Sequence, residues 1–240
     1  MSFLWHELRL AVPMIVHGNP YLLSIIWFTV QVAGIATAAA TAIGLPIGVA
    51  LGLGRFRGRR VLIWLANAGL ALPPVLVGLI LFLLFVPQGP LGGLRLELTR
   101  QGVFVAQAVL ALPFVAALSA AAIMGLPAGL LAQARAFGAG PVALAALAVR
   151  EARIGVIAAV IAALATTLSE VGAILIVGGN VYGYDQTLAS AALYEVNAAS
   201  FADALAIGIV LVALIVVLLG GLSLLQERGG GIRWRFRPLS

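Results

Sequence analysis

The chain has 240 residues, of which 63% are hydrophobic and only 9% are charged, and its mean hydropathy is +1.16. Soluble domains carry roughly 25% charged residues, so the composition excludes an ordinary water-soluble domain. The net charge of +6 would suit nucleic-acid binding. However, the Arg residues stand in short clusters at the ends of apolar stretches, which is the pattern of helices in lipid. The sequence therefore predicts an integral, all-α membrane protein.

Two residue types are missing, and each absence excludes a class of site. Without Cys, the chain can form neither disulfides nor Cys-based metal sites. Without Lys, it cannot form a phosphate-binding loop of the GxxxxGKS/T type, whose Lys reaches the nucleotide phosphates. His6 and His17 have no carboxylate cluster around them in the sequence, so we interpret both as interfacial residues. We therefore expect no catalytic residue, metal or cofactor on this chain, and any ATP that powers it must be hydrolysed by another polypeptide.

Five apolar stretches are long enough to cross a bilayer as helices, which requires about 20 residues each. They are Ile25–Leu53, Val61–Val86, Val103–Met124, Ile154–Val177 and Phe201–Leu225. The first is longer than a bilayer needs, so we expect it to be tilted or to begin in the interface. Its small residues predict close packing against another helix; they are Ala33, Gly34, Ala36, Ala38, Ala39, Ala40 and Gly44.

Residues 1–23 form an N-terminal lead-in that we do not count as a sixth span. Glu7, Arg9, Pro13 and Gly18 divide it into apolar pieces that are too short to cross a bilayer. Its apolar residues predict a short helix that lies in the membrane interface. The lead-in also lacks the basic start, unbroken apolar run and small-residue cleavage site of a signal peptide.

The distribution of Arg predicts the orientation, because cytoplasmic segments retain positive charge. Eleven of the fourteen Arg residues lie in the segments 54–60, 125–153 and 226–240. The segments on the other side hold only Arg9, Arg95 and Arg100. We therefore expect the N-terminus outside and the C-terminus in the cytoplasm, as an odd number of spans requires. Residues 24–225 would form the membrane domain, and residues 226–240 a basic cytoplasmic tail along anionic lipid.

The longest cytoplasmic segment between spans, Gly125–Arg153, predicts two short helices. Apolar, helix-forming sequence stands on both sides of Gly138-Ala139-Gly140-Pro141, and Gly and Pro mark a turn there. Connecting loops are seldom this apolar, and an exposed apolar surface of this kind needs a cover. We expect a protein partner on the cytoplasmic side to provide it.

Prolines and one carboxylate interrupt the predicted spans. Pro73, Pro74 and Pro113 fall inside the second and third spans, where each removes a backbone hydrogen bond and is expected to kink the helix. Glu170 is the only acidic residue in the middle of a span, where a carboxylate is costly. It could bind or relay a cation or proton, or it could be a hydrogen-bonded packing residue. We favour packing, because no second ionisable group lies at that depth.

The order of these features resembles that of the type I permease subunits of bacterial ABC importers, over nearly the whole chain from Ser24 to Leu225. The hallmark of that family is a cytoplasmic EAA loop, in which a Glu-Ala-Ala run stands four residues before a fixed Gly-Ala. Arg135 and Gly138-Ala139 match the pattern. The Glu-Ala-Ala positions read Ala132-Gln133-Ala134 here, so this chain lacks the Glu that begins the motif.

Longer strings resemble the oxyanion permeases of the tungstate, molybdate and sulfate group, and the tungstate type most closely. LPPVLVGL at residues 72–79 resembles the LPPVVxGL of their second or third helix. REARIGV at residues 150–156 resembles their REARPGI, with Ile154 in place of the usual Pro. SEVGAILIVGGNVYGY at residues 169–184 resembles SEVGAxxIVGGNIxGY, where sulfate and molybdate members more often read GEFGA.

The resemblance implies a permease subunit of an ATP-driven oxyanion importer, most closely one for tungstate, with molybdate and sulfate as alternatives. Its partners would be a second copy of the chain, ATP-binding subunits on the cytoplasmic side, an extracytoplasmic substrate-binding protein and membrane lipid, but no nucleic acid. Its place would be the cytoplasmic (inner) membrane of a bacterium or archaeon.

The resemblance and the membrane pattern together assign three groups of residues. The loop that contacts the ATPase would contain Ala132, Gln133, Ala134, Arg135, Phe137, Gly138 and Ala139. The pathway or its gate would be shaped by Pro73, Pro74, Pro113, Thr166, Thr167, Ser169 and Glu170. Five residues of the outer loop would either contact the binding protein or lie in a solvated loop, and they are Asn180, Tyr182, Tyr184, Asp185 and Glu195.

Two other classes of function stay open on the sequence. A secondary transporter or channel driven by a gradient would be favoured by paired charges inside the membrane or by an inverted repeat, whereas the sequence shows one central carboxylate and no evident repeat. A membrane enzyme would need a cluster of His, Asp, Glu or Cys near one membrane face, and no such cluster is visible in the sequence.

Overall fold

The computed structural model describes residues 2–16 and 18–230. The predicted interfacial residue His17 and residues 231–240 of the predicted tail lie outside this part of the chain. Within it, every regular element is helical, which confirms the predicted all-α class.

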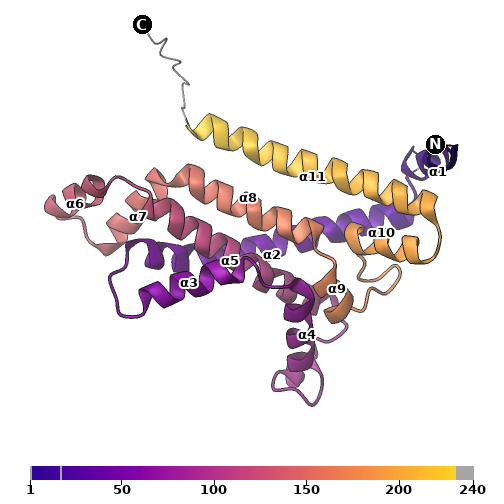
Figure 1. The fold of residues 1–240 in the computed structure, drawn as a ribbon, viewed down its shortest axis with the longest axis horizontal. Coiled ribbons are helices and arrows are strands. Elements are labelled where there is room, and N and C mark those ends of the chain that lie inside the picture. The colour runs from indigo at the N-terminus through magenta and orange to yellow at the C-terminus, as the bar shows by residue number, and fades with distance from the viewer. Residues whose placement is uncertain (1, 17, 231–240) are drawn as a thin grey trace, which may run out of the picture.

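The helices follow one another with short connections. The first half contains α1 (Ser2–Val16), α2 (Pro20–Leu53), α3 (Arg59–Gly69), α4 (Pro74–Phe85), the 3-10 turn η1 (Gly92–Leu94) and α5 (Arg100–Met124). The second half contains α6 (Ala128–Ala136), α7 (Pro141–Glu151), α8 (Arg153–Ser169), α9 (Gly172–Val177), α10 (Leu188–Asn197) and α11 (Phe201–Gly230). In Figure 1, α2, α5, α8 and α11 run along the long axis, with α6 and α7 at one end and α1 and α10 at the other.

Glycines let α2 and α5 pack backbone to backbone in the centre of the bundle. Gly44, Gly48 and Gly52 recur every four residues on the face of α2 that meets α5. A Cβ atom at Gly48 would lie 2.9 Å from both the carbonyl oxygen of Ala116 and the Cβ of Ser119. Helices in lipid associate through such close van der Waals contact between small residues. The predicted close packing of small residues in this helix is confirmed for four of them, Ala33, Ala36, Ala40 and Gly44, which are buried.

Three helices, α2, α5 and α11, are each long and apolar enough to cross a membrane. The bent pairs α3–α4 and α7–α8 pass the same test when each pair is taken together, which gives up to five spans among the described residues. The number agrees with the prediction, but the pair α7–α8 covers Pro141–Ser169 and not the predicted Ile154–Val177. α1 is a separate helix of 15 residues, shorter than the about 20 residues of a span. The first span begins at Pro20 and not at Ile25, because the side chain of Asn19 caps α2 through the N–H of Tyr21. The orientation of the bundle stays a prediction.

The second predicted span, Val61–Val86, is wrong as a single kinked helix. The chain turns by 104° between α3 and α4. Pro73 has an extended backbone, with φ −63° and ψ 119°, and Pro74 is the first residue of α4. A residue before proline avoids the helical region, and proline fits best at a helix N-terminus, where its missing N–H is not needed. The two prolines therefore separate two helices instead of kinking one.

The fourth predicted span, Ile154–Val177, is also interrupted. α8 ends at Ser169, Glu170 has an extended backbone with φ −75° and ψ 135°, and α9 begins at Gly172. The sequence predicted Glu170 in the middle of a continuous span. In the structure it lies between the end of α8 and the start of α9. Backbone N–H and C=O groups at helix ends lack helical partners. A polar side chain at this position can therefore form hydrogen bonds with them.

We expect the Gly48→Ala variant to lower the free energy of unfolding by about 1–3 kcal/mol, because the added methyl group forces α2 and α5 apart. The measurement is the denaturation midpoint of the purified full chain in detergent. Gly34→Ala is the matched control, since a Cβ at Gly34 in the same helix would meet nothing within 4 Å. A loss of stability that is equal in both variants would contradict the role of the glycine contact.

Candidate coupling loop and translocation helices

The turn between α6 and α7 has the hydrogen bonds of a Schellman motif, which ends a helix with a left-handed residue. α6 ends at Ala136, and Gly138 has a φ of +85°. The N–H of Gly138 donates to the carbonyl of Arg135 at 2.9 Å, and the N–H of Ala139 donates to the carbonyl of Ala134 at 3.0 Å. A Cβ at Gly138 would meet nothing within 4 Å. The glycine is therefore required by the backbone conformation and not by a lack of space.

This turn presents an aromatic side chain to the outside. Phe137, the residue before the glycine, is 90% exposed. Three further residues of the predicted loop are exposed on α6, and they are Ala132, Gln133 and Arg135. Ala134 and Ala139 are half-buried. An exposed aromatic ring among small and polar residues is a typical anchor for a protein partner.

One core cluster attaches α6 to the bundle. Leu131 of α6 is partly buried and packs against a core cluster that several helices build, with Ile123 from α5, Ala148 from α7 and Val156 from α8 among its members. Close-packed interiors transmit displacement because they hold few voids. A movement of α6 would therefore act on α5, α7 and α8 together.

The two helix breaks lie against each other. A Cβ at Gly172, the first residue of α9, would lie 2.5 Å from Cγ2 of Val75 in the first turn of α4. A Cβ at Gly78 of α4 would lie 2.7 Å from the Cα of Ala173. The first turns of α4 and α9 are thus in backbone contact. This contact brings together three of the predicted pathway residues, which are Pro73, Pro74 and Glu170.

The carboxylate of Glu170 caps α9. Its Oε1 accepts hydrogen bonds from the N–H of Gly172 at 2.7 Å and from the N–H of Ala173 at 3.4 Å. An anionic acceptor is favourable at a helix N-terminus, whose first N–H groups have no helical partner. In lipid the alternative is an unsatisfied backbone donor, which is costly. This geometry supports the interpretation of Glu170 as a hydrogen-bonded packing residue.

The hydroxyl groups of the predicted pathway bond to their own helix. Thr166, Thr167 and Ser169 each donate to a backbone carbonyl three or four residues earlier in α8. Thr167 is 2% exposed, and its hydroxyl lies 3.4 Å from that of Thr37 in α2. Thr167 therefore faces the inside of the chain and does not line a route here, whereas Ser169 is exposed and Thr166 is half-buried.

Pro113 does not interrupt its own helix. α5 continues through it from Arg100 to Met124 without interruption. Its ring packs on α3, since a Cβ at Gly69 would lie 2.8 Å from the Cβ of Pro113. Pro113 thus provides the surface on which the end of α3 rests.

At the predicted outer end, the connection between α9 and α10 contains a buried carboxylate. Asp185 is fully buried, and its Oδ1 accepts a hydrogen bond from the N–H of Val181. Burial raises the pKa of Asp185, while backbone hydrogen bonds and the positive charge of Arg100 oppose the rise. A Cβ at Gly178 would overlap Oδ2 of Asp185. The carboxylate therefore stabilises the connection by a hydrogen bond within it.

Arg100 joins this connection to the start of α5. Its guanidinium carbon lies 4.9 Å from the ring centroids of both Phe28 and Tyr184. Its Nε donates to the carbonyl of Tyr184 at 2.6 Å. Two cation–π contacts and a charge-assisted hydrogen bond thus hold α2, α5 and the connection together.

The sequence did not predict α10 in this region. The side chains of Thr187 and Ser190 form a capping box at its N-terminus, and the hydroxyl of Thr29 in α2 accepts from the N–H of Leu188 at 2.8 Å. A Thr followed three residues later by a second polar capping residue is a known start signal for a helix, and it could have revealed α10.

The structure corrects the prediction of an outer contact loop at two of its five residues. Tyr182 and Tyr184 are exposed and Asn180 is half-buried, but Asp185 and Glu195 are buried. Glu195 also lies in α10 and not in a loop. Burial raises the pKa of Glu195, and the nearby carboxylate of Asp203 raises it further. Asp185 and Glu195 are thus neither solvated nor open to a partner.

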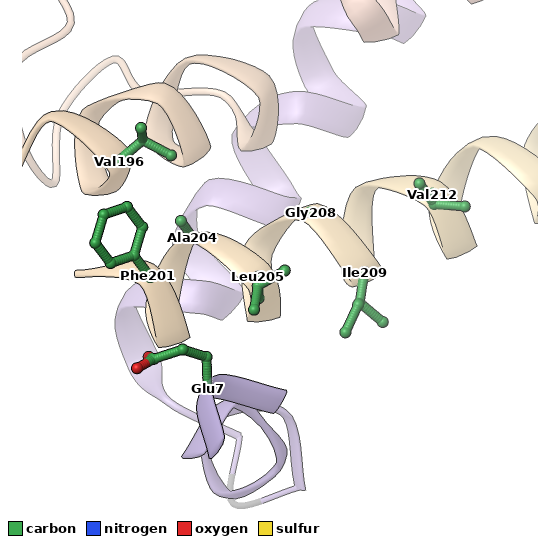
Figure 2. A pocket seen from close by; sticks show the side chains of 8 residues that line it. All are labelled: Glu7, Val196, Phe201, Ala204, Leu205, Gly208, Ile209 and Val212. Atoms are coloured by element: carbon green, nitrogen blue, oxygen red, sulfur yellow. The ribbon is translucent and has the colours of Figure 1, made fainter. Parts of the chain in front are cut away.

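An apolar groove has a volume of about 630 Å³. It is lined by residues of α1, α10 and α11 (Figure 2). Glu7 is its one charged lining residue, and the other side chains are aliphatic or aromatic. Small-molecule sites combine an apolar lining with several convergent polar groups, which this groove lacks. Among the residues that the structure describes, no group of three or more His, Asp or Glu could hold a metal ion.

We expect Glu170→Ala to lower the free energy of unfolding by about 0.5–2 kcal/mol, the usual effect of losing a helix cap. Glu170→Gln keeps an acceptor oxygen and should lose less, so the pair of variants separates capping from charge. The measurement is the denaturation midpoint of the full chain in lipid nanodiscs. If Gln is as damaging as Ala, the negative charge itself is required and the packing interpretation fails.

The comparisons with known proteins agree on one family. The family model described as "Binding-protein-dependent transport system inner membrane component" matches residues 44–228. A probable anion ABC transporter permease of Haloferax volcanii is 36% identical over 200 residues, which cover 81% of this chain and 86% of that protein. The tungstate uptake system permease TupB of Peptoclostridium acidaminophilum is 28% identical and covers 95% of this chain and 100% of its own length. The molybdenum transport permease ModB of Azotobacter vinelandii is 31% identical, with coverage of 81% and 91%.

The fold is also that of a solved ABC transporter. The inward-facing structure of the MetNI methionine ABC transporter superposes with a TM-score of 0.66 at 21% identity, over 87% of this chain and 95% of that one. At this identity the likeness establishes the fold alone. With the family model matched over well over half of the chain, the protein belongs to the binding-protein-dependent inner membrane components, the multi-pass permease subunits of ABC transporters.

Proposed function

We propose that this permease imports an oxyanion, tungstate in particular, along a pathway that two copies of the chain form together. The relatives include a probable anion permease, tungstate permeases and a molybdenum permease, and their names support an oxyanion as the substrate. Two tungstate-system relatives, at 28% and 32% identity, favour tungstate. Molybdate and sulfate are the alternatives that an assay has to distinguish.

The turn between α6 and α7 is the observation that carries this proposal. Its Schellman hydrogen bonds hold Phe137 outward at 90% exposure, next to the left-handed Gly138. An ATP-binding subunit would bury this ring as an anchor. The position that begins the EAA motif is an exposed Ala132, so the docking that we propose rests on apolar contact and on Arg135, not on a Glu.

Contacts described above connect this loop to the helix breaks. Leu131 of α6 packs against the core cluster that contains Val156 of α8. α8 ends at Ser169, and the next residue, Glu170, caps α9 with its carboxylate. α9 in turn lies against the first turn of α4 at Val75. Closure of the ATP-binding subunits would thus move α6 and shift α4 and α9, which border the pathway in this proposal.

The charge pattern suits a pathway that passes an anion without retaining it. No Arg lies in the interior of α2, α4, α5 or α8. A divalent anion held tightly inside a membrane would need such cations. Selectivity would therefore reside in the extracytoplasmic binding protein, which the exposed Tyr182 and Tyr184 would contact.

The test is ATP turnover by the purified chain together with its ATP-binding subunit and binding protein in nanodiscs. Tungstate, molybdate and sulfate are added separately, and we expect tungstate to stimulate turnover at the lowest concentration. Stimulation by molybdate or sulfate at a lower concentration would replace tungstate as the substrate. If none of the three oxyanions changes turnover, an oxyanion is not the substrate and the proposal fails.

Gly138→Val should lower the stimulated turnover about tenfold or more, because a β-branched residue cannot take the left-handed conformation that positions Phe137. Gly138→Asn should retain most activity, since Asn tolerates that conformation. Gly140→Ala is a matched control, as Gly140 has a φ of −72° and open space around it. Equal activity of the Val and Asn variants would show that the turn geometry is not what the ATPase requires.

A further inference from the structure

A second groove lies between α2 and α7, at the end of the bundle that carries most of the Arg residues. Its volume is about 710 Å³. α2 lines it with one face near the C-terminus of the helix, which consists of Leu45, Pro46, Val49 and Ala50. All four side chains are apolar, so this wall offers no hydrogen bond to a soluble ligand.

α7 forms the opposite wall with residues at helical spacing. They are Val142, Ala145, Ala146, Val149 and Arg150, at positions i, i+3, i+4, i+7 and i+8, which share one face of a helix. Arg150 is the one charged residue in the lining, and it lies in the last turn of α7. The groove is therefore an apolar slot with a cation at one end.

The neighbouring basic loop indicates the depth of the groove in the membrane. α2 ends at Leu53 and is followed within seven residues by Arg55, Arg57, Arg59 and Arg60. Leu45 and Ala50 precede Arg55 by ten and five residues, or about 15 and 8 Å along a helix. If the Arg cluster lies at the headgroups, as positive charge on the cytoplasmic side requires, the α2 wall lies at the level of the acyl chains. α7 bends by 74° away from α8, so it crosses the end of the bundle instead of continuing it.

We propose that this groove binds an anionic phospholipid of the cytoplasmic leaflet, with an acyl chain between α2 and α7 and the phosphate at Arg150. The apolar walls fit the chain, and the single cation complements the headgroup. Basic pockets between helices on the cytoplasmic side are suited to anionic lipids. A soluble protein partner fits less well, because the α2 wall lies below the headgroups. The proposal is independent of which oxyanion is transported.

The position of the lipid gives it a mechanical role. α7 follows the coupling turn directly, with Gly140 as its N-terminal cap. Its Ala148 packs in the same cluster as Leu131 of α6. A lipid that fills the slot braces α7 against α2 and keeps the coupling turn in place. The efficiency of coupling therefore depends on the anionic lipid content of the membrane.

The test uses the full chain with its ATP-binding subunit, delipidated in detergent and then incubated with dioleoyl phosphatidylglycerol and dioleoyl phosphatidylcholine in equal amounts. Native mass spectrometry counts the retained lipids. We expect the wild type to retain phosphatidylglycerol in preference to phosphatidylcholine. Arg150→Gln should lower that retention about fivefold, which corresponds to about 1 kcal/mol for one basic residue at the membrane surface. Arg150→Lys, which keeps the charge, should restore it.

Two matched controls make the test specific. Arg153→Gln removes an exposed Arg that does not line the groove, and it should leave retention unchanged. Ala146→Trp fills the slot and should abolish retention, whereas Ala143→Trp, on the same helix outside the lining, should not. An unchanged denaturation midpoint confirms that each variant is folded.

Three results would overturn the proposal. The first is equal loss in the Arg150→Gln and Arg153→Gln variants, which would indicate unspecific surface attraction. The second is full lipid retention by Ala146→Trp. The third is loss of the ATP-binding subunit from Ala146→Trp with lipid retention unchanged, which would assign the groove to a protein partner.

Discussion

Backbone groups inside a bilayer have to find partners within the protein, because no water is available to them. This constraint decides how the chain can interrupt a helix. Before α4, two prolines remove N–H groups that would otherwise stand unpaired at the new helix start. Before α9, Glu170 accepts the hydrogen bonds of the first N–H groups. The two solutions differ chemically, yet both deal with the backbone N–H groups at the start of a new helix.

Close approach of backbones then joins these interruptions into one structure. Gly78 and Gly172 allow the first turns of α4 and α9 to touch, just as Gly44, Gly48 and Gly52 allow α2 and α5 to touch along their length. Contacts of this kind are stiff, since no side chain stands between the helices to adjust. The glycine-packed pair α2–α5 therefore serves as the frame. α6, α8 and α9 pack against this frame or against its core clusters. Packed helices therefore connect the turn between α6 and α7 with the two helix breaks.

Sequence patterns predicted the features that depend on local sequence. The apolar stretches gave the spans, and Gly with Pro gave the turn between α6 and α7, because both signals are local. The breaks were harder to predict: hydropathy stays high through residues 154–177, and only the hydrogen bonds of Glu170 distinguish a capped break from a continuous helix. The sequence places Asp185 and Glu195 between the last two predicted spans, which predicts either a solvated loop or contacts with the binding protein. Their burial depends on Val181 and on α10, which are tertiary features that no single-residue pattern contains.

The coupling loop shows which parts of a motif geometry can enforce. Gly138 cannot vary freely, since the left-handed conformation and its two hydrogen bonds to Arg135 and Ala134 decide where Phe137 points. The first motif position is different in kind. Ala132 is exposed on α6 and carries no part of the turn. In the proposed docking, an aromatic anchor can contribute about 2 kcal/mol or more, and a charge pair at the same interface can also be favourable. A chain with the glycine turn and the ring but without the Glu keeps the anchor and has no ion pair at Ala132 to add to it.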